Sequence, residues 1–152
     1  KEIRNSMVVD FGIKKSHTSK KFNDENVFEV KRFFYDNQEP RYIARGQVLT
    51  SAVPELSEKV FSLQKFNHAS LSEILVNKFN FKIYNQKIVS NSIILTKEEA
   101  DFFQVSQNSA ATKWVSFFFD KDQHLLLIDT EISIKNIYID LVYKDFNNNE
   151  KV

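Results

Sequence analysis

The chain has 152 residues, of which 42% are hydrophobic, and its 21 Lys and Arg side chains nearly balance its 20 Asp and Glu side chains. This length and composition are typical of one soluble domain with a buried core. The absence of Cys excludes a disulfide scaffold and a thiolate metal site, and no apolar run approaches the roughly 20 residues of a membrane-spanning helix. The nearly neutral net charge gives no indication of nucleic-acid binding by these residues alone.

The first part of the chain predicts a β-hairpin. Residues 1–26 are mostly polar and contain one short apolar patch, from Met7 to Phe11. Val27–Tyr35 and Arg41–Leu49 are rich in β-branched and aromatic residues, which is typical of strands. The polar residues between them predict a connecting turn of about five residues.

Two capping motifs predict helices in the middle of the chain. Ser70 stands three residues before Glu73, and Thr96 stands three residues before Glu99. In such a capping box the first side chain accepts a hydrogen bond from a free backbone N–H, and the acid reaches back to the cap. The apolar spacing after each cap predicts helices that extend to positions 79 and 103.

The rest of the chain predicts further strands. These are Phe81–Leu95, Thr112–Asp120, Leu125–Ile134 and Ile137–Tyr143. The predicted order is a hairpin, a helix, a strand, a helix and a three-stranded meander. This order indicates an α+β fold, with a largely antiparallel sheet and a few helices packed on one face.

Several short motifs occur in an order that is characteristic of one family. Val30-Lys31-Arg32 matches a family strand, Pro54-Glu55-Leu56 a turn, and Ser70-Leu71 the start of a helix. Asp36 to Pro40 and Asp120 to Gln123 match two turns, and Tyr138 matches a later strand. Over about residues 27–143 the chain therefore resembles the UTRA domain of HutC-subfamily GntR transcription regulators, which has a chorismate-lyase-like fold.

The resemblance implies a sensor rather than an enzyme. UTRA domains bind a small metabolite, often a phosphorylated sugar or an amino acid, and they form dimers. Residues 1–152 are then expected to form one effector-binding and dimerisation domain of a bacterial regulator, with no cofactor, no metal site and no membrane contact. Contact with DNA is expected only through an N-terminal winged helix-turn-helix outside this sequence. The chain has no signal segment at its start, so we expect a cytoplasmic protein.

Arg32 is the first candidate ligand-binding residue. Alternation along its strand places it on the same face as Val30 and Phe34, which makes that face mostly apolar. A buried charge needs a partner. The partner is either an anionic ligand held by the guanidinium fork or an acid such as Asp129 or Glu131.

Four further residues are candidates, each with an alternative interpretation. Ser70 lies at a helix N-terminus, which can bind an anion or simply be capped. Asp129 and Ser133 share a strand face that lines a pocket or faces water, and the resemblance places a pocket side chain near Ser133. Arg45 precedes Gly46 on a strand face that is otherwise expected to be solvated.

Some family pocket positions hold other residues in this chain. Phe34 replaces a second arginine, Ala44 replaces a glutamate, and Leu127 replaces another glutamate. Two alternatives therefore stay open: a chorismate-lyase-like enzyme, and a dimerisation module that has lost its ligand. No catalytic motif and no histidine spacing typical of a metal site is present.

Overall fold

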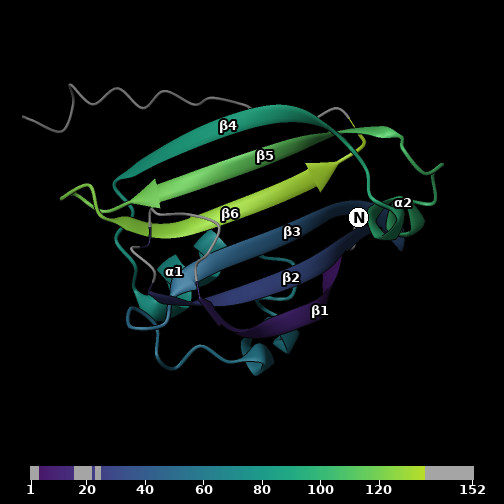
Figure 1. Ribbon diagram of the computed structural model, residues 1–152. Helices are drawn as coiled ribbons and strands as arrows, with labels where there is room; N and C mark the ends of the chain where they lie inside the picture. Colours follow the sequence, from purple (N-terminus) through teal and green to yellow (C-terminus); the bar gives the residue numbers. More distant parts are fainter. Residues whose placement is uncertain (1–3, 16–21, 23–24, 136–152) are drawn as a thin grey trace, which may run out of the picture.

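The computed structural model describes residues 4–15, 22 and 25–135. Six strands form one sheet in the order β1-β2-β3-β6-β5-β4, and all five pairings are antiparallel (Figure 1). The strands are β1 (Arg4–Lys15), β2 (Asn26–Asp36), β3 (Glu39–Leu49), β4 (Asn85–Ile94), β5 (Ala110–Phe119) and β6 (Leu125–Ser133). The helices are α1 (Leu71–Phe79), α2 (Lys97–Phe103) and the 3-10 helix η2 (Glu58–Ser62). The predicted α+β class and antiparallel sheet are confirmed.

Strand β1 was not predicted from the sequence, which indicated only a short apolar patch there. It pairs with β2 along its whole length, with a bulge between Val8 and Asp10. The bulge adds a residue and so interrupts the alternation of polar and apolar side chains. Much of this edge strand is also exposed, so few apolar residues mark it.

Two predicted boundaries in the first half of the sheet are wrong. The turn between β2 and β3 has two residues rather than five, because Asn37 and Gln38 both take positive φ angles, of 49° and 69°. Strand β4 begins at Asn85 rather than at residue 81, since the chain leaves α1 through Asn80 in the left-handed conformation. The strand predicted at Ile137–Tyr143 lies outside the described residues.

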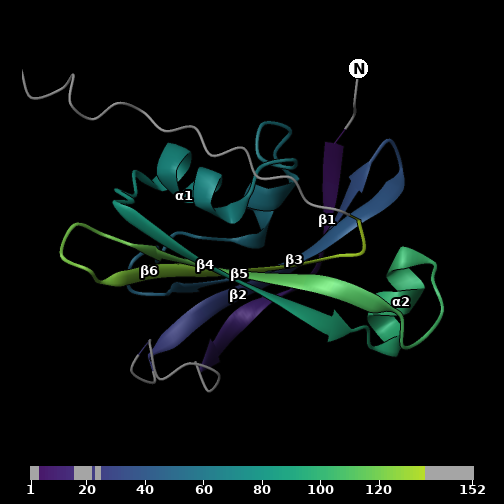
Figure 2. The same cartoon turned by 90° about the horizontal axis from the view of Figure 1, so that it is seen from above.

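Helix α1 and η2 cover one face of the sheet, which we call the α1 face (Figure 2). Leu71, Ile74 and Leu75 of α1 are buried there, in a core cluster to which β2, β3, β5 and β6 also contribute. The side chains of Phe61 and Leu127 belong to the same cluster.

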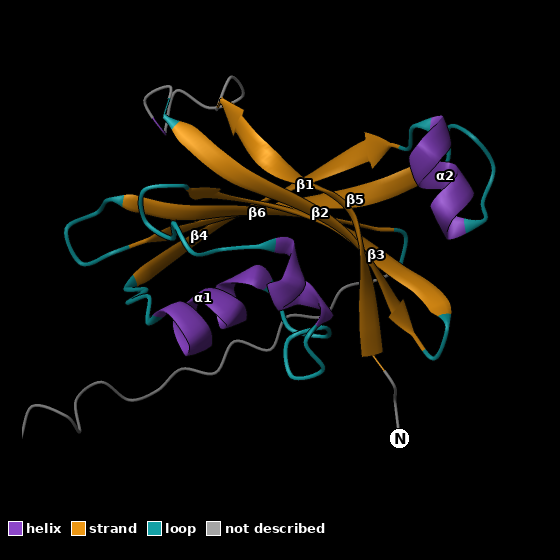
Figure 3. Cartoon of the chain, turned by 90° about the horizontal axis from the view of Figure 1, so that it is seen from below, coloured by secondary structure: helices purple, strands orange, loops and turns teal. Residues whose placement is uncertain are grey.

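Helix α2 packs at one end of the sheet on the opposite face, the α2 face (Figure 3). Its Phe103 shares a core cluster with Ile43, and Phe33 and Ile132 pack against that cluster. The prediction of helices on one face therefore holds for α1 and not for α2. The reason is that the α2 face has its own apolar patch at this end of the sheet, and packing of α2 against that patch removes it from water.

Both predicted N-cap residues are present, but among the described contacts only the second forms the complete capping box that was predicted for both. The Ser70 hydroxyl accepts a hydrogen bond from the backbone N–H of Glu73 at 3.2 Å. Thr96 and Glu99 form a complete capping box, with bonds of 2.8 and 3.3 Å. Among the described residues, no helix combines the length and the apolar character that crossing a membrane requires.

We expect Gly46→Ala to destabilise the protein by about 1–3 kcal/mol, which is the usual cost of overpacking a core. A Cβ atom at this position would overlap Cδ2 of Leu71, which is only 1% exposed and has little room to move. The measurement is urea unfolding at equilibrium.

Gly12→Ala is the matched control, because a Cβ at Gly12 meets nothing within 4 Å. In a Leu71→Ala background the cost of Gly46→Ala is expected to shrink. Equal effects of Gly12→Ala and Gly46→Ala would contradict this packing argument.

Candidate functional site

The strand register aligns polar residues that are far apart in the sequence. Arg32, Ala44, Glu131 and Trp114 lie directly opposite one another across β2, β3, β6 and β5. Asp129 lies in the next row of the same α1 face. We call Arg32, Tyr42, Trp114, Asp129 and Glu131 the polar cluster.

Arg32 lies at one end of the polar cluster and is almost completely buried. Its side chain is 2% exposed, and its Nη1 donates a hydrogen bond of 2.9 Å to the carbonyl oxygen of Ala69. The guanidinium carbon lies 4.6 Å from the ring centre of Phe34 and 4.9 Å from that of Phe61. The prediction that Arg32 points inward is therefore correct.

The guanidinium of Arg32 is not fully satisfied by the protein. A guanidinium can donate five hydrogen bonds. Within the described part of the chain, the bond to Ala69 is its only hydrogen bond, and no carboxylate oxygen lies within 4.0 Å of it. The salt bridge to Asp129 or Glu131, one of the two partners considered from the sequence, is thus not formed.

Two acids of β6 occupy the same face, and neither forms an ion pair with a cation of the described residues. Burial, together with the charge of Glu131, raises the pKa of Asp129 to about 8, against the opposing effect of Arg32. Burial also raises the pKa of Glu131. The alternative that this strand face is a wet outer face is wrong, since Leu127, Asp129 and Ser133 are all buried.

The side chain of Trp114 carries an unsatisfied donor. Its Nε1 atom is buried and has no hydrogen-bond partner among the described residues, where it is the sole side-chain atom of this kind. Leaving such a donor unpaired costs about 1–3 kcal/mol. Only the strand register, which pairs Trp114 with Glu131, reveals that Trp114 lies beside the acids.

Tyr42 was also missed from the sequence. Burial raises the pKa of its phenol, so the hydroxyl stays protonated at all physiological pH values. Its ring stacks on Phe34 at a centroid distance of 4.4 Å. The alternation of β3 that places Tyr42 on the same face as Ala44 could have identified it.

The structure brings some of the predicted site residues together and separates others. Ser133 shares the α1 face with Asp129, and its hydroxyl lies 3.4 Å from the carbonyl oxygen of Arg41. Ser70 follows Ala69, the residue that Arg32 contacts, and its hydroxyl lies 3.0 Å from that of Ser72. Arg45 lies on the opposite face of the sheet, half exposed and 3.7 Å from Glu29. The proposed role of each residue remains a prediction.

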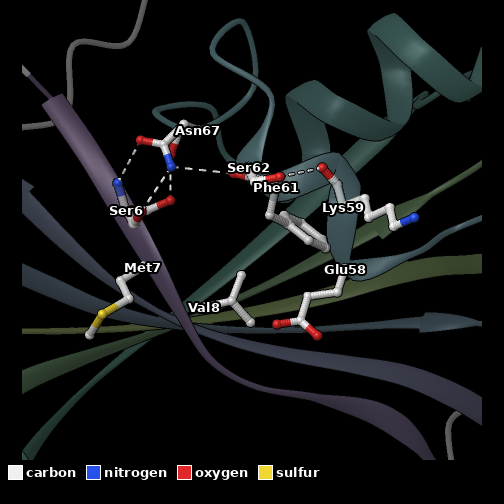
Figure 4. Close-up of a pocket in the computed structure, with 8 residues that line it drawn as sticks. All are labelled: Ser6, Met7, Val8, Glu58, Lys59, Phe61, Ser62 and Asn67. Carbon is white, nitrogen blue, oxygen red and sulfur yellow. Dashed lines mark hydrogen bonds between the residues drawn. The ribbon is translucent and has the colours of Figure 1, made fainter.

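A separate cavity of about 450 Å³ lies between β1 and η2 (Figure 4). The Asn67 amide accepts from the backbone N–H of Ser6 at 3.0 Å, and it donates to the carbonyl oxygens of Ser6 at 2.8 Å and Phe61 at 3.3 Å. None of the predicted site residues lines this cavity. The cavity is lined by Ser6, Met7, Val8, Glu58, Lys59, Phe61, Ser62 and Asn67.

The turn between β5 and β6 groups possible metal ligands, although the sequence predicted no metal site. One ligand atom each from Asp120, Asp122 and His124 lies within 4.8 Å of the others. The Asp120 carboxylate accepts hydrogen bonds from the backbone N–H groups of Asp122 and His124, at 2.8 and 2.9 Å. These bonds account for the grouping as turn structure.

We expect Asp129→Asn to stabilise the protein increasingly as the pH rises from 5 to 8, by about 4 kcal/mol across this range. The folded protein holds the Asp129 proton up to about pH 8, whereas an unfolded aspartate loses it near pH 4. The folded state therefore binds more protons in this window, and its stability falls as the pH rises through it. Asparagine resembles the protonated acid and removes this loss. Urea unfolding of both proteins at three pH values measures the difference in their free energies of unfolding.

Asp101→Asn, on the exposed surface of α2, is the control and should show no such trend. If the difference in unfolding free energy between wild type and Asp129→Asn is the same at every pH, Asp129 ionises normally in the folded protein and the prediction is wrong.

The fold is shared with effector-binding domains of transcription regulators. No protein-family model matches the sequence, and no curated protein sequence matches it either. Among solved structures, the trehalose repressor effector-binding domain of Bacillus subtilis has 14% identity and a TM-score of 0.74, over 92% of this chain and 98% of that one. A GntR-family transcriptional regulator from Bacillus cereus has 12% identity and a TM-score of 0.73, over 93% and 99%.

A longer structure is also similar. The possible transcriptional regulator YydK of Bacillus subtilis has 16% identity and a TM-score of 0.77, over 91% of this chain. The match spans 62% of the length of YydK. The resemblance to a UTRA domain is thus confirmed in three dimensions: the chain has the fold of the effector-binding domains of GntR-type transcription regulators.

Proposed function

We propose that this chain is the effector-binding and dimerisation domain of a GntR-type regulator of the HutC subfamily. In this proposal a small polar metabolite binds against the polar cluster on the α1 face and alters DNA binding by a winged helix-turn-helix outside this sequence. The domain senses the metabolite and does not transform it. The fold supports a regulatory role, and the polar cluster supports the site.

The proposal rests mainly on the burial of Arg32 and on its single hydrogen bond to the described residues. A guanidinium that is 2% exposed, with one hydrogen bond and no ion pair among the described residues, is costly for a structure to retain. The Nε1 of Trp114, on the same face, is a buried donor without a hydrogen-bond partner among the described residues. Both costs disappear when a ligand supplies acceptors.

The contact between Arg32 and Ala69 suggests how binding is transmitted. Ala69 directly precedes the N-cap of α1, so a ligand that engages Arg32 acts on the segment that begins this helix. A ligand changes a conformational equilibrium only by binding one state more tightly than another. The α1 N-terminus is the element that we propose differs between the two states.

The α2 face supports the dimerisation part of the proposal. Val89 of β4 is 37% exposed and pairs with Val115 of β5, which is only partly buried. On the side of the sheet away from the polar cluster, Val89 and Val115 therefore form a small apolar patch, which Lys87, Asn91 and Lys113 flank. A second copy of the chain would cover it.

We expect Trp114→Phe to weaken metabolite binding by about 2–10-fold, the worth of one hydrogen bond. The phenyl ring keeps most of the packing and lacks the Nε1 donor. The measurement is a thermal-shift screen of the chain with sugars, sugar phosphates, amino acids and nucleosides, followed by calorimetry on the compounds that bind. Arg32→Gln is expected to lose the binding entirely, in a protein that circular dichroism shows to be folded.

Tyr84→Phe, at a side chain that is 74% exposed, is the control and should bind like wild type. The site assignment fails if compounds bind to Trp114→Phe and Arg32→Gln as well as they bind to wild type and Tyr84→Phe. The proposed function fails if no compound in a broad library binds wild type.

We expect the chain to form a dimer that Val89→Lys dissociates, because a charge in an apolar interface is costly. Light scattering after size-exclusion chromatography measures the mass. Ile88→Lys is the matched control, since Ile88 is 43% exposed on the opposite face of the same strand. A monomeric wild type, or a dimer broken by Ile88→Lys instead, would contradict the α2-face interface.

A further inference from the structure

We infer that Glu131 and Asp129 receive a protonated amino group of the effector, and that the site takes an amine-bearing small molecule without a phosphate group. This inference rests on the proposed function and names the chemical class of ligand for the same site. It assigns to Glu131 and Asp129 the role of determining specificity.

The balance of charge on the α1 face is the first argument. One buried cation, Arg32, shares the polar cluster with two acids, Asp129 and Glu131. A phosphate dianion placed against Arg32 would bring two more negative charges next to these acids. A protonated amine instead adds the positive charge that both acids lack.

The separation of the charges is the second argument. Arg32 and Glu131 stand on either side of Ala44, two strand spacings or about 10 Å apart along the row. No ion pair joins Arg32 to either acid within the described part of the chain. Ala44, which lies between them, contributes only a methyl group and pairs with neither charge. One ligand can therefore place an acceptor against Arg32 and an amino group against Glu131.

The behaviour of the acids supports the same ligand class. Burial raises the pKa values of Asp129 and Glu131, and the opposing effect of Arg32 does not cancel it. An ammonium group between them would lower both pKa values and restore the charged forms. The Nε1–H of Trp114, the residue directly opposite Glu131, then donates a hydrogen bond to an oxygen of the ligand.

The test compares three small probes on the full chain at equal ionic strength: ethanolamine hydrochloride, ethylene glycol and sodium phosphate. Ethanolamine and ethylene glycol differ only in the amino group. We expect about 100 mM ethanolamine to raise the melting temperature by about 2–4 °C, and we expect neither other probe to do so. Glu131→Gln and Asp129→Asn should each remove the effect of ethanolamine.

Glu55→Gln is the matched control, because Glu55 is exposed and lies before η2, outside the polar cluster. The inference is overturned if ethanolamine does not stabilise the protein, if its effect survives in both Glu131→Gln and Asp129→Asn, or if phosphate stabilises the protein instead. Stabilisation by phosphate that disappears in Arg32→Gln would reject the amine and leave the proposed function intact. Failure of the three probes together with the metabolite library would reject both.

Discussion

The Arg32 guanidinium ties the sheet to the segment that begins α1. It lies between the rings of Phe34 and Phe61 and donates to the carbonyl oxygen of Ala69, one residue before the helix cap. A charge this deeply buried is costly unless its donors are satisfied, and the described residues accept only one hydrogen bond from it. The interface between α1 and the sheet therefore buries a charged group in addition to apolar side chains.

The polar cluster combines several features that reduce the stability of the fold. Within the described residues, the Nε1 of Trp114 has no hydrogen-bond partner, burial raises the pKa of Asp129, and the guanidinium makes one hydrogen bond; each of these features costs free energy. Perturbed ionisable groups that gather in one place are typical of functional sites. By contrast, Arg45 on the α2 face lies half exposed near Glu29, where an ion pair contributes little. Burial therefore distinguishes the charged groups of the candidate site from the solvent-exposed charges on the α2 face.

Local signals made much of the fold predictable. Alternation identified β2, β3, β5 and β6, and the caps at Ser70 and Thr96 located both α-helices, because these patterns depend on neighbouring residues. Strand β1 escaped prediction because its bulge breaks the alternation and its exposed face carries few apolar residues. The position of α2 on the opposite face was likewise not predictable, since it depends on an apolar patch assembled from several distant strands.

The sequence by itself determined which way Arg32 points, which residues of β6 share a face, and where both α-helices begin. All of these follow from backbone periodicity and from hydrogen bonds between close neighbours. Only the tertiary structure decided that Glu131 and Trp114 lie in one row with Arg32, that Arg45 is on the other face, and that neither Asp129 nor Glu131 forms an ion pair with the guanidinium. The physical reason is register: pairing between distant strands sets which side chains meet, and no local pattern encodes it.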